Sequence, residues 1–295
     1  MSTPLLTALG ALIPIFYILT FVWMPETPHY YIIKNDPDRA RKSLKWLRGM
    51  ADVDEEIEGI KKTVEFDLMN DGTMRELFTD KGNRKALLIS IGLLSAQQIS
   101  GIAAILAYTT IIFNEVSSGI SSGVSVIITG VVQLVVAILL VFVADKAGRR
   151  TFLLLSMFSS TIFLIGEAVY FHLKANGNNV SGISWLPVTA IVGYLCGYTV
   201  GLGTLPMALI SEIFPCNVKA YATMVSTIYL SLAATCVSQL YPIVSNAYGI
   251  HVAFYVFAIG TIFFMVLTYL YLPETKGKSL DAIQDILQGR SESKL

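Results

Sequence analysis

Residues 248–272 read YGIHVAFYVFAIGTIFFMVLTYLYL, and none of them is Asp, Glu, Lys or Arg. As an α-helix, with a rise of about 1.5 Å per residue, this run is long enough to cross a hydrocarbon core about 30 Å thick. Six further apolar runs contain only Glu167 and Lys219 as charged residues. They lie at about 5–24, 86–113, 119–144, 151–173, 183–211 and 218–243. The sequence therefore predicts seven transmembrane helices.

The overall composition agrees with this prediction. Hydrophobic residues make up 54% of the 295-residue chain and charged residues 14%, whereas soluble domains carry roughly 25% charged residues. So large an apolar surplus cannot be hidden from water, which argues against a soluble enzyme. The 21 basic and 21 acidic residues cancel, which removes the argument for a nucleic-acid partner.

The distribution of Lys and Arg predicts an orientation. All 21 of these residues except Lys174 lie in four segments. The segments hold 12, 3, 1 and 4 of them and are 25–85, 145–150, 213–219 and 273–295. Loops rich in Lys and Arg stay in the cytoplasm, so we expect the N-terminus outside and the C-terminus inside. The sequon Asn179-Val180-Ser181 then lies outside, and Asn179 is a candidate glycosylation site.

Segment 25–85 is polar and is expected to form amphipathic helices beneath the membrane. Asp36 and Pro37 suit the start of a helix, and Gly49 suits its end. Asp52 and Glu55 have the spacing of a capping box for a second helix. Because acidic and basic residues are mixed, a solvated surface is favoured over a docking surface for a partner.

A tripeptide occurs twice, each time directly after an apolar run. Pro25-Glu26-Thr27 follows the first run and Pro273-Glu274-Thr275 follows the last. The repeat indicates two homologous halves, of which the first is represented only by its last helix. The expected domains are that last helix of an N-terminal bundle (1–24), a cytoplasmic helical insert (25–85), a six-helix C-terminal bundle (86–272) and a cytoplasmic tail (273–295).

Signals for catalysis and cofactors are missing from the sequence. The three Cys and three His residues are scattered, without a CxxC pair, a metal-ligand set or a catalytic triad. Neither a Walker loop nor a Gly-x-Gly-x-x-Gly motif occurs, so an ATP-driven pump is unsupported. We expect no metal, no cofactor and no enzymatic activity.

Five motifs distinguish the chain. They are PETPHYYI (25–32), QQISG (97–101), DKAGRR (145–150), ISEIFP (210–215) and PETKGKSL (273–280). Together they resemble the sugar porters of the major facilitator superfamily, and among these the insect facilitated trehalose transporters. The resemblance covers the family's sixth to twelfth helices. It implies an all-α membrane protein with a partial major facilitator fold, seven transmembrane helices and a cytoplasmic helical insert, working by alternating access.

Uncharged polar side chains mark a candidate sugar site. Gln97, Gly101 and Tyr108 have the spacing of one helical face, and Gln133 lies on a similar stripe of the next run. Such groups suit a neutral polyhydroxy substrate. The resemblance implies that Gln97 and Gln98 bind sugar and that Gln133 replaces an asparagine that contacts sugar.

Two other runs carry small or hydroxyl residues. In 183–211, three glycines precede a helix break that is expected near Gly203 and Pro206; they are Gly193, Gly197 and Gly201. In 218–243, hydroxyls recur every four residues, at Thr223, Thr227, Ser231 and Thr235. For these hydroxyls, contacts between helices are favoured over a cavity wall.

Four contacts of the family pattern are absent from this chain. The positions concerned are Ala103, Ala107, Met207 and the pair Leu230 and Ser231, where the family has polar or aromatic residues. A larger or less polar ligand, altered specificity and loss of transport are all consistent with these changes.

Charged residues gather at the expected cytoplasmic ends of the helices. They are Glu26, Asp145, Arg149, Arg150, Glu212, Lys219 and Glu274. The resemblance implies that they form an ion-pair network that holds the outward-open state. Lys219 replaces an arginine and is a weaker bidentate partner. The alternative is that these charges only set the topology.

The sequence thus predicts a facilitator of trehalose or a hexose in the plasma membrane. Its expected partners are a small neutral sugar, the lipid bilayer and the missing N-terminal helices. Proton symport is one alternative, and a truncated, non-transporting membrane protein with a sensor or regulatory role is another. Glu167, deep in its run, is expected to snorkel or to pair with a neighbouring helix rather than to carry protons.

Overall fold

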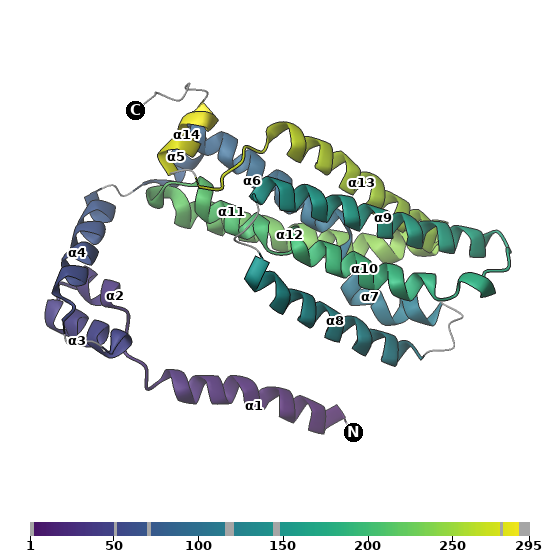
Figure 1. The fold of residues 1–295 in the computed structure, drawn as a ribbon, viewed down its shortest axis with the longest axis horizontal. Helices are drawn as coiled ribbons and strands as arrows, with labels where there is room; N and C mark the ends of the chain where they lie inside the picture. Colours follow the sequence, from purple (N-terminus) through teal and green to yellow (C-terminus); the bar gives the residue numbers. More distant parts are fainter. Residues whose placement is uncertain are drawn as a thin grey trace. The chain divides into compact units, whose positions relative to one another are not determined.

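The computed structural model describes residues 3–49, 52–69, 72–115, 121–143, 148–277 and 280–288. The chain divides into two compact units, Met1–Asp71 and Gly72–Leu295. The described residues of both units form helices joined by short turns (Figure 1).

The first unit contains four helices. They are α1 (Thr3–Phe21), α2 (Pro28–Ile33), α3 (Pro37–Arg48) and α4 (Asp54–Met69). The expected ends of α3 are confirmed, because the Asp36 carboxylate accepts a hydrogen bond from the backbone N–H of Arg39 (3.1 Å) and Gly49 ends the helix at φ +66°. The start of α4 falls two residues after Asp52, whose carboxylate accepts from the backbone N–H of Asp54 at 3.4 Å.

A small apolar core holds α2, α3 and α4 together. Its buried members include Ile32, Leu44 and Ile57. At its edge, Arg48 of α3 forms a salt bridge with Glu56 of α4, with 2.6 Å between Nη2 and Oε1. The hydrogen bond from this guanidinium lowers the pKa of the Glu56 carboxyl. Both faces expected of segment 25–85, an apolar inner face and a charged outer one, are therefore present.

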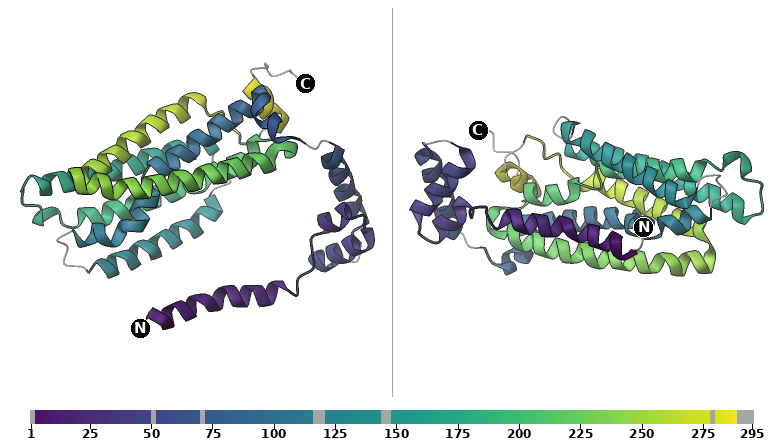
Figure 2. Two further views of the ribbon diagram at one scale, coloured as in Figure 1. Left: turned by 180° about the vertical axis from the view of Figure 1, so that it is seen from behind. Right: turned by 90° about the horizontal axis from the view of Figure 1, so that it is seen from below.

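The second unit holds the long apolar helices. Its elements are α5 (Met74–Thr79), α6 (Lys81–Ile99), α7 (Ile102–Asn114), α8 (Ser122–Val143), α9 (Arg149–Ala175), a short 3₁₀ turn (Ser181–Ile183), α10 (Leu186–Val200), α11 (Leu205–Ile213), α12 (Cys216–Tyr248), α13 (Ile250–Tyr271) and α14 (Leu280–Gln288). The long helices lie side by side in one bundle (Figure 2). Helices α5 and α14 flank the predicted apolar runs and belong to the same unit.

Six helical segments in the described residues are long and apolar enough to cross a membrane. They are Lys81–Asn114, Gly123–Leu140, Arg149–Ala175, Ser181–Ile213, Asn217–Tyr248 and Ile250–Tyr271. Each overlaps one predicted transmembrane run, which confirms six of the seven by length and composition. The seventh run corresponds to α1. Its stretch Gly10–Phe21 is apolar but shorter than the six membrane-length segments, so a membrane crossing by α1 stays a prediction.

Helix α9 packs closely against α10. A Cβ atom placed on Gly201 would lie 2.7 Å from the carbonyl oxygen of Phe152, and Gly193 and Gly197 abut Phe163 and Ser159 in the same way. The predicted small-residue face of α10 is therefore a close-packing face.

The hydroxyl stripe of α12 behaves differently from the expectation. Thr227, Ser231 and Thr235 are exposed, and each hydroxyl donates to the carbonyl oxygen four residues earlier, at 2.8 to 3.0 Å. These recorded hydrogen bonds lie within one helix, so they do not join α12 to its neighbours.

Two apolar segments are interrupted. The break between α10 and α11 at residues 201–204 confirms the expected one. The break between α6 and α7 was not expected: Gly101 adopts φ +87°, and a Cβ there would lie 2.7 Å from Cγ of Phe257. The prediction that Gln97, Gly101 and Tyr108 share one continuous helical face is therefore wrong, since Gln97 lies on α6, Tyr108 lies on α7 and Gly101 lies between the two helices.

Ser156 of α9 provides hydrogen-bond partners for the backbone at the break between α10 and α11. Its hydroxyl donates to the carbonyl oxygen of Gly197 (2.7 Å) and accepts from the backbone N–H of Leu202 (2.9 Å). Ser156 is fully buried. Because water cannot replace a lost partner in an apolar bundle, this side chain holds the interruption in place.

Replacing Ser156 by Ala should destabilise the bundle by about 1–3 kcal/mol, because a buried N–H loses its acceptor. Denaturation of the full chain in detergent, followed by circular dichroism, measures the change. Ser159→Ala is the matched control, since within the described residues that hydroxyl donates to a carbonyl of its own helix, at 3.2 Å, and to no other helix. Equal losses for the two variants would contradict the assigned role.

Candidate functional site

The two helix breaks meet at Gln97. Its amide nitrogen donates to the carbonyl oxygen of Gly203, across 3.4 Å, and so links the end of α6 to the α10–α11 break. Gln97 and Gln98 are each 6% exposed, and neither amide oxygen has a hydrogen-bond partner among the described residues. Two buried acceptors thus remain available next to the interrupted backbone, where hydroxyl donors of a ligand would satisfy them.

Tyrosine hydroxyls form hydrogen bonds with serines near the end of α6. The Ser100 hydroxyl lies 3.0 Å from that of Tyr194, which also donates to the Ser100 carbonyl oxygen. One turn earlier, Ser95 lies 2.5 Å from the hydroxyl of Tyr229 on α12. Sequence reasoning missed both tyrosines, although a phenol in an apolar run is itself a signal because its hydroxyl needs a partner.

Tyr108 is placed by aromatic packing. Its ring centroid lies 5.2 Å from that of Tyr241 on α12, and Tyr241 in turn stacks on Phe257 of α13. Phe257 is the same ring that presses on Gly101. The break between α6 and α7 and the position of Tyr108 therefore depend on one aromatic cluster, of which sequence reasoning identified only Tyr108.

Gln133 lies on α8 and is half-buried, and the described contacts do not join its side chain to Gln97 or Gln98. Helix α8 packs against α7 and α10. Three positions that depart from the family pattern, Ala107, Met207 and Ser231, are exposed in this unit. The structure thus places Gln97 and Gln98 at the end of α6, next to the breaks, whereas no contact among the described residues links Gln133 to them.

Charged groups join three segments at one end of the bundle. Arg149, the first residue of α9, pairs with Glu212 of α11, with 3.3 Å between Nε and Oε1; the side chains are 21% and 29% exposed. The Glu274 carboxylate accepts from the backbone N–H of Arg149 (2.8 Å), and the Thr275 hydroxyl donates to Glu212 (2.9 Å). A carboxylate at a helix N-terminus is stabilised by the helix dipole.

The other charged residues predicted for this network differ in their contacts and exposure. The Arg150 guanidinium donates to the carbonyl oxygen of Tyr269 and lies over its ring, 5.1 Å from the centroid. Lys219 is half-buried and forms no salt bridge within the residues that the structure describes. Glu26 is exposed and belongs to the first unit, and Asp145 lies outside the described residues. Sequence reasoning missed Thr275 and Tyr269.

Glu167 of α9 is buried inside the second unit and does not extend to its surface, so the expectation that it snorkels is wrong. It is 1% exposed, and neither carboxylate oxygen has a hydrogen-bond partner in the described part of the chain. An unpaired charge at such a buried position is energetically costly.

Asn179 lies in an exposed loop. Its side-chain oxygen accepts from the backbone N–H and the hydroxyl of Ser181, at 3.0 and 2.6 Å. Its glycosylation stays a prediction.

Known relatives align with nearly the whole of this chain. A facilitated trehalose transporter, Tret1, of Anopheles gambiae is 36% identical over 287 residues, which are 97% of this chain and 36% of the relative. Tret1 of Culex quinquefasciatus is 35% identical over 288 residues, 97% of this chain and 56% of the relative. The chain thus spans about a third to somewhat over half of the length of these relatives.

Solved structures agree on the fold. The inward-open form of the xylose transporter XylE from E. coli matches with a TM-score of 0.72 and 19% identity, over 92% of this chain and 54% of that one. XylE bound to 6-bromo-6-deoxy-D-glucose matches with a TM-score of 0.68 and 20% identity, over 92% of this chain and 56% of that one. These likenesses indicate a major facilitator fold.

Residues 3–287 match the family model described as "Sugar (and other) transporter". With its apolar helices and its interrupted segments, the chain is an integral membrane protein that belongs to the sugar (and other) transporter family.

Proposed function

We propose that this chain serves the facilitated transport of trehalose or a hexose across a membrane. The observation that carries the proposal is the meeting of two helix breaks at Gln97, whose unsatisfied amide oxygen and that of Gln98 are suited to sugar hydroxyls. Discontinuous helices form substrate sites near the bilayer midplane in transporters. Gln97 and Gln98 are the central residues of the 34-residue segment Lys81–Asn114, which agrees with that depth.

Alternating access requires a second bundle that faces the first. In this proposal α1 is the last helix of that bundle, and further N-terminal helices complete it. The greater length of the Tret1 relatives supports this arrangement. The sugar then binds between the bundles and is released by their rocking.

The ion pairs at the start of α9 are proposed as a cytoplasmic gate. Arg149, Glu212 and Glu274 link α9, α11 and the segment after α13, and Glu26, Asp145, Arg150 and Lys219 are proposed to join them. The gate holds the outward-open state while its pairs are intact. The side chains of Arg149 and Glu212 are mostly buried, so solvent screens their attraction less than it would screen that of an exposed pair.

The proposed location is the plasma membrane, with the N-terminus outside and the C-terminus in the cytoplasm. All Lys and Arg residues except Lys174 then lie on the cytoplasmic side, in accordance with the positive-inside rule. Asn179, which is exposed, is then on the outside.

Proton-coupled symport is the second candidate. Glu167 favours it, because buried carboxyl groups in membrane helices mark proton pathways. The two candidates differ in a simple measurement: a protonophore abolishes accumulation by a symporter and leaves facilitated uptake unchanged. We favour facilitated transport, since Glu167 has no recorded contact with Gln97 or Gln98.

Uptake of labelled trehalose and glucose into cells tests the function, with this chain alone and with a chain extended to the length of its relatives. We expect saturable uptake by the extended chain. Gln97→Ala should raise its KM about fivefold, the value of one lost hydrogen bond. Gln239→Ala, an exposed amide on α12, is the control. If the extended chain is present at the cell surface at normal abundance and neither sugar shows saturable uptake, the proposal is contradicted and a sensor role is favoured.

Arg149→Ala should shift the extended chain towards inward-facing states, because the pair with Glu212 is lost. Labelling of Thr204→Cys by an impermeant thiol reagent in inside-out vesicles, on a background without other cysteines, should become severalfold faster. Lys174→Ala is the matched control, since its pair with Glu115 (3.2 Å) lies at the other end of α9. An unchanged labelling rate would contradict the gate.

A further inference from the structure

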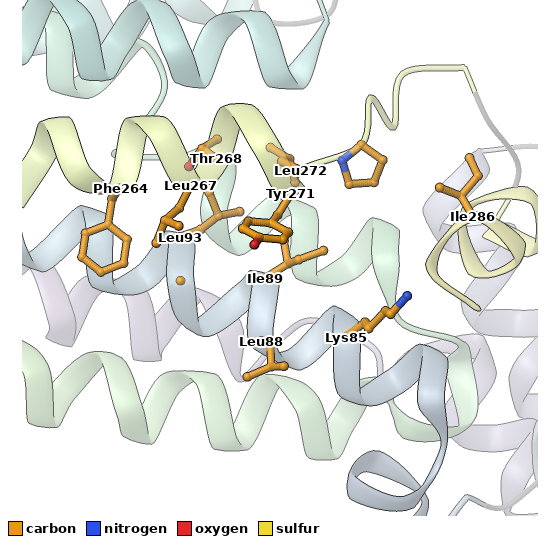
Figure 3. Close-up of a pocket in the computed structure, with 12 residues that line it drawn as sticks. Lys85, Leu88, Ile89, Leu93, Phe264, Leu267, Thr268, Tyr271, Leu272 and Ile286 are labelled. Carbon is orange, nitrogen blue, oxygen red and sulfur yellow. The ribbon is translucent and has the colours of Figure 1, made fainter. Parts of the chain in front are cut away.

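A crevice of about 540 Å³ lies between α6 and α13, away from the two helix breaks. Figure 3 shows Ile89 and Leu93 of α6 facing Leu267 and Tyr271 of α13, and Leu88 of α6 also lines the crevice. Its volume is within the range of roughly 300–1,000 Å³ that is typical of ligand pockets. It is formed entirely by the second unit.

The crevice is polar at one end and apolar at the other. Lys85 lies at the end next to Ile286 of α14, and Phe264 and Leu93 lie at the opposite end (Figure 3). Leu93 lies eight positions after Lys85, which corresponds to about 12 Å along the helix. This is less than half of a hydrocarbon core about 30 Å thick, and Lys85 lies near the start of the membrane-length segment Lys81–Asn114, so we place the crevice in one leaflet.

The side chains of the crevice match a lipid better than a sugar. Of the twelve lining residues only Lys85, Thr268 and Tyr271 carry a polar side-chain group, and Thr268 is buried. A sugar would leave most of its hydroxyls without partners against such walls. Leu88 and Tyr271 are 66% and 69% exposed, so the crevice opens to the surroundings of the bundle.

The positive charges next to the crevice indicate which class of lipid it would bind. Lys85 is exposed and, among the residues whose side chains are described, forms no salt bridge. Its neighbours on the same turn of α6, Lys81 and Arg84, are also exposed cations. Tyr271 adds a phenol at the last residue of α13, and aromatic side chains at the ends of membrane helices favour the headgroup level. A cation above an apolar slot complements a phosphate that is linked to acyl chains.

We propose that an anionic phospholipid binds in the crevice between α6 and α13. One acyl chain lies against Leu88, Ile89 and Leu93 and reaches Phe264, and the phosphate is held by Lys85. The site is separate from the sugar site at Gln97, and its occupancy does not depend on sugar transport.

Photolabelling of the full chain tests the proposal. The chain is reconstituted into phosphatidylcholine vesicles with a trace of phosphatidylglycerol that carries a diazirine on its acyl chain, irradiated and mapped by peptide mass spectrometry. We expect labels within residues 85–93 and 264–272. The same probe built on phosphatidylcholine should label these segments about fivefold less, the factor that one basic side chain contributes at an anionic headgroup.

Two variants separate the charge from the slot. Lys85→Ala should lower labelling by the anionic probe about fivefold, whereas Arg84→Ala, which removes an equal charge that does not line the crevice, should change it less. Gly92→Leu should abolish labelling by both probes, because a Cβ there has no atom within 4 Å and the new side chain fills the slot. Gly123→Leu on α8, equally open, is the control for folding and insertion.

The proposal is overturned by equal labelling with the two probes, by equal effects of Lys85→Ala and Arg84→Ala, or by labels that persist in Gly92→Leu. Absence of label from both segments in the unaltered chain also overturns it. None of these outcomes depends on sugar uptake, so failure of this site and failure of the proposed function are distinguishable.

Discussion

The second unit depends on one constraint: where an apolar helix is interrupted, each freed backbone group must find a partner inside the protein. Ser156 meets this need between α10 and α11, with one hydroxyl that bonds both Gly197 and Leu202. Gln97 reaches the same break from α6. The side chains that repair the backbone and those proposed to meet sugar are therefore neighbours, and a change to either set alters the other.

The sequence predicted most of the fold because its main signals are local. Runs with at most one charged residue located six membrane-length helices, and Asp36 and Gly49 located both ends of α3. The break near Pro206 was also predictable, since proline and closely spaced glycines mark it. The break at Gly101 was not, because its geometry depends on Phe257, which lies far along the chain. Long-range partners, such as Tyr241 for Tyr108, leave no local pattern in the sequence.

The repeated tripeptide illustrates how context assigns different tasks to the same residues. In the first copy, the Thr27 hydroxyl accepts from the backbone N–H of Tyr30 (3.3 Å) and caps α2. In the second copy, Glu274 receives the backbone N–H of Arg149 and Thr275 binds Glu212. One copy starts the helix that follows it, and the other stabilises helices that precede it. Both copies follow an apolar helix, α1 or α13, but the bonds that they form differ.

The bond between Glu274 and the start of α9 also constrains the order of events during synthesis. The two residues are 125 positions apart, so α9 leaves the ribosome and enters the bilayer long before its carboxylate partner exists. Its first turn can be completed only after α10 to α13 have been inserted. Closure of this end of the bundle is thus a late step of biogenesis, and the last transmembrane helix delivers the residue that completes it.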